Sequence, residues 1–201
     1  YGVGGTSFSY VPAIDWHPSG TVLAIGTGAG AGVSGGMLRV YSFDGSSLTY
    51  LTGDGWSFSP QAQIWGIAWD PTGTYLSVAG NSWAFFYPIS VYSFNGSTLS
   101  LVTGLTGLAP NNFSTNWDPS GQYVTFCTDT APKYSNIYYF NGSTLTLVNS
   151  TGVSGLSSSW SSDGRFISMT GWSTDPSAPS MTINAITFNY PLSTPVTRSG
   201  R

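Results

Sequence analysis

The chain has 201 residues, of which 6% are charged and 15% are aromatic, and its formal net charge is −3. Its acids are all Asp, and its bases are four Arg and one Lys. The near absence of Glu and Lys excludes a helix-rich protein, the aromatic content excludes disorder, and five scattered bases exclude an electrostatic nucleic-acid binder.

The first nine residues are rich in Gly, Ser and Thr, and they predict a flexible N-terminal arm over 1–9. This segment has neither the basic start nor the apolar run of a secretory signal. No stretch of about 18 consecutive apolar residues occurs anywhere, so no membrane span is expected.

From residue 14 onward, one pattern occurs four times: a Trp, a tight turn ending in Gly, and a strand of alternating polarity. The copies are IDWHPSGTVLAIG at 14–26, IAWDPTGTYLSVAG at 67–80, TNWDPSGQYVTF at 115–126 and SSWSSDGRFISM at 158–169. Their Trp anchors are Trp16, Trp69, Trp117 and Trp160, spaced 53, 48 and 43 residues apart. In the turn Asp70-Pro71-Thr72-Gly73, Asp accepts a backbone N–H, Pro presets φ and Gly closes a type I turn.

Each copy has a second half that reads as a hairpin. The instances are LRVYSFDGSSLTYL at 38–51, ISVYSFNGSTLSLV at 89–102, NIYYFNGSTLTLV at 136–148 and a degenerate INAITFNYPLSTPV at 183–196. The Asn95-Gly96 pair predicts a type I′ turn with positive φ at both central residues. The same turn explains the glycosylation sequon at Asn141, which leaves Asn112 and Asn149 as candidate glycosylation sites.

Four antiparallel strands in each repeat predict an all-β fold, a four-bladed β-propeller with four strands per blade. The arm 1–9 then precedes a single domain over 10–201, with blades at about 10–53, 54–104, 105–151 and 152–198. A two-sheet sandwich is the alternative architecture, although it does not need the same turn four times in register. Four blades closing in one chain and two chains forming a larger ring are both open.

The unit WDPTGTYLSVAG followed by VYSFNGSTLSLV resembles the WD-repeat-like propeller family in its bacterial and phage form, over residues 10 to about 198. The resemblance implies a propeller that serves as a binding or assembly platform. The chain lacks the Gly-His dipeptide and the strand-ending Trp-Asp dipeptide of the eukaryotic form. Nothing therefore implies eukaryotic scaffold partners.

The loops that join the second strand to the third, and one repeat to the next, vary in length and lie at one end of the predicted blades. Variable loops on a rigid scaffold are the usual place for binding. Their aromatic residues are the candidate contacts for another subunit or a sugar ring: Trp56, Phe58, Trp83, Phe85, Phe86, Tyr87 and Trp172. Alternatively, the same rings fold back over the blades and complete the core.

Catalytic chemistry is poorly represented in the sequence. The chain has no Glu, one histidine (His17) and one cysteine (Cys127), which is expected to be a small buried strand residue. Asp70 and Asp118 occupy repeated turns, where turn formation explains them. No nucleophile–base pair and no metal-ligand cluster is evident, so we expect no catalytic residues, no metal and no cofactor.

The low charge suggests how such a domain is used. A surface of Ser, Thr, Asn, Gly and Tyr can be desolvated against a copy of itself without burying unpaired charge. The sequence therefore predicts a non-enzymatic structural protein that assembles with itself, in an extracellular filament or on a virion or appendage surface. The alternative is a carbohydrate-binding propeller module with glycans as partners.

Overall fold

The computed structural model describes residues 11, 13–28, 36–56, 63–81, 87–106, 111–128, 135–150, 155–170 and 181–185, with only the backbone at 36–37, 54–56 and 181–185. These residues form fifteen strands and no helix. All strand pairs are antiparallel. The all-β prediction is confirmed.

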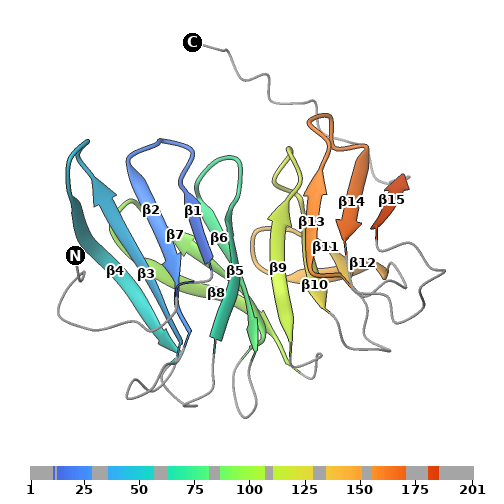
Figure 1. Cartoon of the computed structure of the whole chain (residues 1–201), viewed down its shortest axis with the longest axis horizontal. Coiled ribbons are helices and arrows are strands. Elements are labelled where there is room, and N and C mark those ends of the chain that lie inside the picture. Colours follow the sequence, from blue (N-terminus) through green and yellow to red (C-terminus); the bar gives the residue numbers. More distant parts are fainter. Residues whose placement is uncertain are drawn as a thin grey trace.

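The strands form four sheets in chain order (Figure 1). Blade 1 comprises β1 (Ala13–Trp16), β2 (Val22–Gly26), β3 (Gly36–Phe43) and β4 (Leu48–Trp56), and blade 2 comprises β5 (Gln63–Trp69), β6 (Tyr75–Asn81), β7 (Ile89–Phe94) and β8 (Leu99–Leu105). Blade 3 comprises β9 (Asn112–Trp117), β10 (Tyr123–Thr128), β11 (Asn136–Phe140) and β12 (Leu145–Ser150), and blade 4 comprises β13 (Ser157–Trp160), β14 (Phe166–Thr170) and β15 (Met181–Ala185). In every sheet each strand pairs with the next along the chain, as the repeat predicts.

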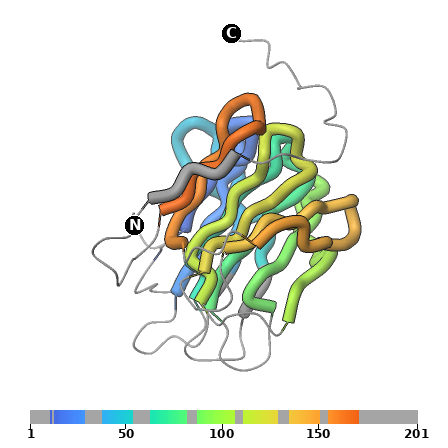
Figure 2. Tube along the Cα trace, turned by 90° about the vertical axis from the view of Figure 1, so that its right-hand side faces the viewer, coloured from blue at the N-terminus to red at the C-terminus, as the bar shows by residue number. Residues whose placement is uncertain are grey.

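The four blades form an open arc, so closure within one chain, one of the two possibilities that the sequence left open, is not seen among the described residues. The first strands of successive blades lie side by side, β1 against β5, β5 against β9 and β9 against β13. Blades 1 and 4 stand at opposite ends of the arc in Figure 1, and Figure 2 views it from the blade 4 side. Among the described residues the sheets do not close into a ring. The main contacts between strands of different blades all join blades that are neighbours in the sequence.

The turn after each Trp forms as predicted. The Gly73 N–H donates to the Asp70 carbonyl at 2.9 Å, the Thr72 N–H donates to Asp70 Oδ2 at 3.0 Å, and φ of Gly73 is +77°. In blade 1 His17 replaces Asp, and its Nδ1 accepts from the Ser19 N–H at 3.0 Å. The His17 ring therefore accepts the same turn N–H in blade 1 that the Asp70 carboxylate accepts in blade 2.

The second hairpin of blades 1 to 3, where the structure describes it, differs from the predicted type I′ turn. In the hairpin between β7 and β8 only Gly96 has positive φ, at +97°, and four residues separate the paired positions Phe94 and Leu99. Asn95 Oδ1 instead accepts from the Ser97 and Thr98 N–H groups, at 3.0 and 2.9 Å. Asn thus closes the loop with its side chain, an Asx turn, and needs no left-handed backbone.

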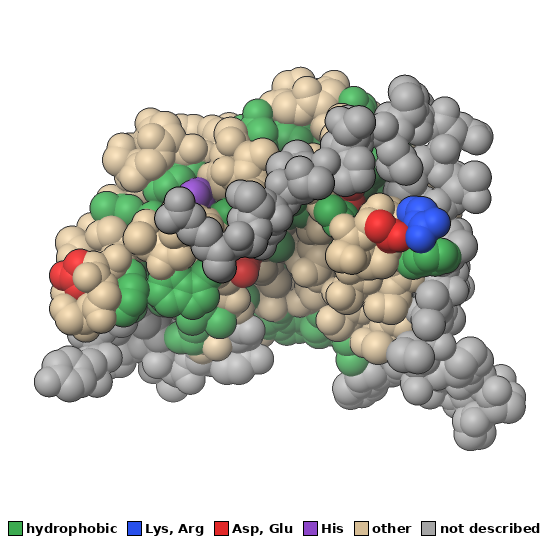
Figure 3. All heavy atoms as spheres, turned by 90° about the horizontal axis from the view of Figure 1, so that it is seen from above, with side chains coloured by type: hydrophobic (Ala, Val, Ile, Leu, Met, Phe, Trp, Pro, Cys, Tyr) green, Lys and Arg blue, Asp and Glu red, His purple; other side chains and the backbone are tan. Residues whose placement is uncertain are grey.

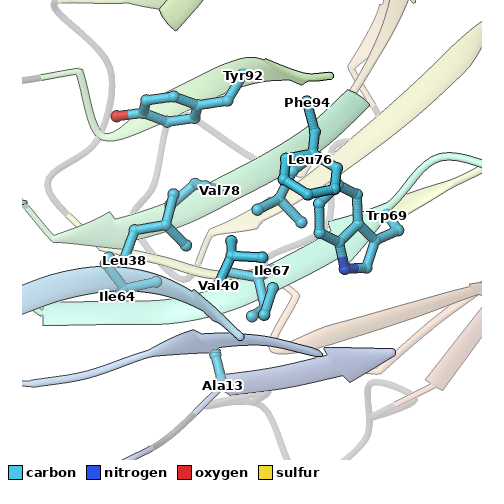
Figure 4. Packing of buried hydrophobic residues seen from close by; sticks show 11 residues of the cluster. Ala13, Leu38, Val40, Ile64, Ile67, Trp69, Leu76, Val78, Tyr92 and Phe94 are labelled. Carbon is cyan, nitrogen blue, oxygen red and sulfur yellow. The ribbon is translucent and has the colours of Figure 1, made fainter. Parts of the chain in front are cut away.

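The hydrophobic core lies between blades (Figure 4). Each blade has a Trp face, which carries its anchor Trp, and a small-residue face on the other side of the sheet. In blade 2 the Trp face consists of Ile67, Trp69, Leu76, Val78, Tyr92 and Phe94, and it packs on the small-residue face of blade 1, with Ala13, Ala24, Leu38 and Val40. The remaining contacts repeat this arrangement, blade 3 on blade 2 and blade 4 on blade 3.

Cys127 is fully buried in β10, as predicted for a small strand residue. Burial raises the pKa of its thiol. A neutral buried thiol is a poor nucleophile, since the thiolate is the reactive form.

Candidate assembly surfaces

Successive blades are joined by a repeated indole hydrogen bond. Trp117 Nε1 of blade 3 donates to the Ala68 carbonyl of blade 2 at 3.1 Å. Trp160 Nε1 of blade 4 donates to the Asn116 carbonyl of blade 3 at 3.3 Å. The acceptor is in each case the residue just before the Trp of the preceding blade, so the bond ties neighbouring inner strands together.

The same carbonyls also accept a hydroxyl from their own blade. Ser77 Oγ donates to the Ala68 carbonyl at 3.2 Å, and Thr125 Oγ1 donates to the Asn116 carbonyl at 3.1 Å. Each of these hydroxyls also pairs with a hydroxyl of the next blade at 2.8 Å, Ser77 with Thr115 and Thr125 with Ser158. The interfaces between blades 2, 3 and 4 are therefore joined by hydrogen bonds between uncharged groups.

The turns at the Trp end also contact one another. A Cβ at Gly73 would overlap the ring of His17 in blade 1, whose Nε2 lies 3.1 Å from the Gly73 carbonyl oxygen. Cβ atoms built at Gly121 and Gly164 would lie 3.4 and 3.5 Å from Pro71 and Pro119 of the preceding blades. Gly20 of blade 1 has nothing within 4 Å of that position.

Blade 1 exposes the part of its Trp face that lies along the inner strand. Trp16 is 46% exposed, whereas Trp69 and Trp117 are 6% and 8% exposed. Ile14, two residues before this Trp, is 62% exposed, while Ile67 at the same position of blade 2 is 8% exposed. Farther out on this face, Leu23 and Tyr41 are buried, and the Tyr41 ring packs edge-on against Tyr50 with centroids 5.7 Å apart. The exposed area of the Trp face therefore lies along the inner strand.

Blade 4 exposes its small-residue face. Phe166 lies on this face of β14 and is 42% exposed. Its counterpart in blade 2, Tyr75, packs edge-on against Phe140 of blade 3, with ring centroids 4.9 Å apart. Ser159, Ser168 and Thr170 share the exposed face with Phe166, and Ile167 and Met169 point the other way into the core.

The inner strands and their turns also line a hollow of about 870 Å³. All four repeats contribute their Trp and adjacent turn residues to it. Its carboxylates are engaged by local hydrogen bonds: Asp70 accepts from the Tyr75 N–H at 2.6 Å, and Asp118 accepts from the Tyr123 N–H at 2.8 Å. Asp15 accepts from the Trp69 N–H at 2.7 Å, and burial raises the pKa of its carboxyl despite this bond.

The hollow brings no complete catalytic set together. Asp70 and Asp118 are held by their turns, and His17 lies against Trp69, with ring centroids 4.9 Å apart. Within the part of the chain that the structure describes, no group of three His, Cys, Asp or Glu is placed to hold a metal. Among the described residues the hollow therefore offers a surface of mixed polar and aromatic groups.

Most of the aromatic loop contacts predicted from the sequence lie outside the described residues: Phe58, Trp83, Phe85, Phe86 and Trp172, together with the side chain of Trp56. The predicted arm 1–9 lies outside them as well. Tyr87 is described and is half-buried, and its ring lies so close to Gly104 of β8 that a Cβ there would overlap it. This tyrosine packs on its own blade.

The two candidate glycosylation sites differ in exposure. Asn112 is 2% exposed, and its Nδ2 donates to the Gly80 carbonyl at 3.4 Å, so attachment of a glycan there would have to precede folding. Asn149 lies on the exposed outer strand β12. The folded chain therefore presents Asn149 and encloses Asn112.

The sequence pattern treats the four repeat Trp residues alike, as anchors of the repeat, and it did not single out Trp16 or Phe166 as surface features. The signal that could have found them is that Trp16 belongs to the first blade and Phe166 to the last. A residue that is buried by the neighbouring blade loses that cover in the first or last blade of an open arc. Among the described residues no helix is long and apolar enough to cross a membrane.

The sequence matches no protein-family model and no curated protein. Solved structures do resemble the fold. Sqt1 from Chaetomium thermophilum has a TM-score of 0.65 and 16% identity, and the match covers 82% of this chain and 41% of that one. The periplasmic gluconolactonase PpgL of Pseudomonas aeruginosa has a TM-score of 0.62 and 18% identity, with 79% and 50% covered.

A chain of a mitotic checkpoint complex is also similar, with a TM-score of 0.59 and 19% identity, covering 80% of this chain and 45% of that one. These likenesses support a β-propeller-like fold. At such identities they carry the fold alone, and the enzyme among them does not make this chain an enzyme. The chain spans about half the length, or less, of the structures it matches.

Proposed function

We propose that this protein is a non-enzymatic structural subunit that associates with itself, in an extracellular filament or on a virion or appendage surface. The observation that carries the proposal is exposed apolar surface on a chain that is only 6% charged. Ile14 and Trp16 at one end and Phe166 at the other are 62%, 46% and 42% exposed. Figure 3 shows few charged side chains among the described atoms of the face it presents.

Two physical properties support this use. An interface without charge is desolvated at little cost, because no ion has to leave water. The interfaces between blades 2, 3 and 4 already show this chemistry, since their hydrogen bonds join hydroxyl, indole, amide and carbonyl groups. A surface with few titratable groups also changes little with pH, which suits exposure outside a cell.

The test is the association state of the purified full chain. We expect sedimentation velocity, run from micromolar to near-millimolar concentration, to show species larger than one chain, and negative-stain micrographs to show their form. A strictly monomeric chain over the whole concentration range would overturn the proposal. Sedimentation in the presence of a mild detergent is the control for non-specific aggregation, because a specific assembly keeps one defined stoichiometry.

Carbohydrate binding is the alternative prediction from the sequence, and its candidate residues Trp56, Trp83 and Trp172 fall where the side chains are not described. A glycan array with Trp→Ala variants at these positions tests it. Glycan binding by a chain that stays monomeric would favour this alternative over the structural role.

A further inference from the structure

We infer that a second copy of this chain closes the arc: the Trp face of blade 1 in each copy packs on the small-residue face of blade 4 in the other. The product is a ring of eight blades, within the usual range of about four to eight. This inference rests on the proposed self-association and names both the partner and the surfaces that meet.

The chain carries both halves of the contact that it uses internally. Three times, the Trp face of one blade packs on the small-residue face of the blade before it. Blades 1 and 4 stand at the two ends of the arc (Figure 1). Blade 1 exposes the inner-strand part of its Trp face, and blade 4 exposes its small-residue face. Since the two exposed halves are copies of halves that fit each other, a second copy of the chain supplies the missing partner to both.

The hydrogen-bond acceptor of the missing contact is already in place. Ser168 Oγ donates to the Ser159 carbonyl at 3.3 Å, just as Ser77 and Thr125 donate to the carbonyls before their own Trp residues. In blades 2 and 3 the same carbonyl also receives the indole N–H of the next blade. In the ring, Trp16 of the second copy supplies that N–H to Ser159.

The contacts between aromatic rings and between turns of neighbouring blades also have counterparts in the proposed contact. Phe166 occupies the position from which Tyr75 reaches Phe140 of the next blade, and Phe43 is the equivalent of Phe140 on blade 1. Gly20, with open space around it, is the equivalent of the glycines that receive a proline from the preceding turn. The blade 4 turn carries Ser162 in the place of that proline, and a serine is no bulkier.

One position differs from the two hydroxyl-paired interfaces. In those two interfaces the residue two positions before the Trp, Thr115 or Ser158, pairs its hydroxyl with a hydroxyl of the preceding blade. In the proposed contact Ile14 meets Ser168 instead. The Ser168 hydroxyl already donates to the Ser159 carbonyl, so the apolar side chain leaves no donor without a partner.

In a two-fold ring both contacts form at once, and the second becomes effectively intramolecular. Association is therefore expected to be cooperative and to stop at two chains.

The first experiment compares single substitutions in the full chain by sedimentation velocity and native mass spectrometry. Trp16→Ser and Phe166→Ser should each raise the dimer dissociation constant at least about tenfold, because both remove a large ring from the contact. Leu147→Ser and Leu101→Ser are the matched controls, since these leucines are 54% and 47% exposed on outer strands. The controls should stay within about twofold of the wild type, within the usual error of additivity.

The second experiment pairs charges across the proposed contact. Ile14→Asp and Ser168→Arg should each abolish the two-chain species, because each leaves a lone charge in both contacts of the ring. A mixture of the two variants should restore it, since the mixed ring has one wild-type contact and one Asp–Arg contact. Both positions are at least partly exposed, and circular dichroism checks that each variant folds.

The outcomes separate this inference from the proposed function. Self-association that persists unchanged in the Trp16 and Phe166 variants would overturn the end-face contact while the structural role stands. Open-ended polymers that depend on these residues would overturn the closed ring. A wild-type chain that stays monomeric would overturn both.

Discussion

Two buried indoles at the same repeat position, one with a hydrogen-bond acceptor and one without any in the described part of the chain, give a direct test of how the blades are held together. Trp69 and Trp117 occupy the same repeat position and are 6% and 8% exposed. Trp117 Nε1 donates to the Ala68 carbonyl. Trp69 Nε1 is buried and, among the described residues, has no acceptor. We therefore predict different stabilities for Trp69→Phe and Trp117→Phe.

The magnitude follows from two contributions. Each change removes roughly 40 Å² of buried aromatic surface, worth about 1 kcal/mol. Trp117→Phe also removes a hydrogen bond worth about 1 kcal/mol, so the total loss is about 2 kcal/mol. Trp69→Phe removes an unpaired buried donor, which relieves about 1–3 kcal/mol and leaves the variant near the wild type or above it.

Urea denaturation followed by far-UV circular dichroism measures the difference, with differential scanning calorimetry as the second probe. A difference of about 2 kcal/mol corresponds to a melting-temperature gap of about 4–8 °C for a chain of this size. Equal losses in the two variants, or a larger loss in Trp69→Phe, would refute the role assigned to the indole–carbonyl bond.

Three further predictions concern turns and titration. Gly73→Ala should lower the unfolding free energy more than Gly20→Ala, because both have positive φ but only Gly73 faces His17; chemical denaturation of the pair measures the difference, and equal losses would contradict it. Asp15→Asn should stabilise the fold at neutral pH, because burial raises the pKa of Asp15 and so disfavours its charged form. The gain in unfolding free energy should shrink as pH falls through that raised pKa and vanish below the unfolded pKa of about 3.8. Melting curves of the variant and the wild type across pH measure it. Asn141→Ala should cost about 1 kcal/mol, because Asn141 Oδ1 accepts from the Ser143 and Thr144 N–H groups, and an unchanged urea midpoint would argue against this cap.

The blade could be predicted from the sequence because its signals are local. The turn of Asp70 to Gly73 and the alternation of β6 depend on neighbours within a few residues. The hairpin at Asn95 was predicted in the right place with the wrong turn type, because the Asn side chain supplies the acceptor that a type I′ backbone would otherwise provide. Pairing could therefore be predicted, but backbone conformation at one residue could not.

Closure and exposure could not be predicted in the same way. A repeat motif predicts how one blade packs on the next. The number of blades that close a ring depends on the angle between neighbouring sheets, which the motif does not determine. Trp16 and Trp117 have the same motif, and their exposed fractions of 46% and 8% differ because, among the described residues, a preceding blade covers only Trp117. The candidate surface is thus a property of position in the array, which no local pattern encodes.

Repeat proteins of stacked units usually end in capping units with a polar outer face, because an uncapped end exposes the chemistry of an interior interface. Blade 1 of this chain has no such cap in its described residues: Ile14 and Trp16 repeat the apolar and aromatic types of Ile67 and Trp69. An end that is built like an interior interface, facing water at 62% and 46% exposure, is stabilised by any surface of the complementary kind. The complementary surface that this chain itself carries is the face of blade 4.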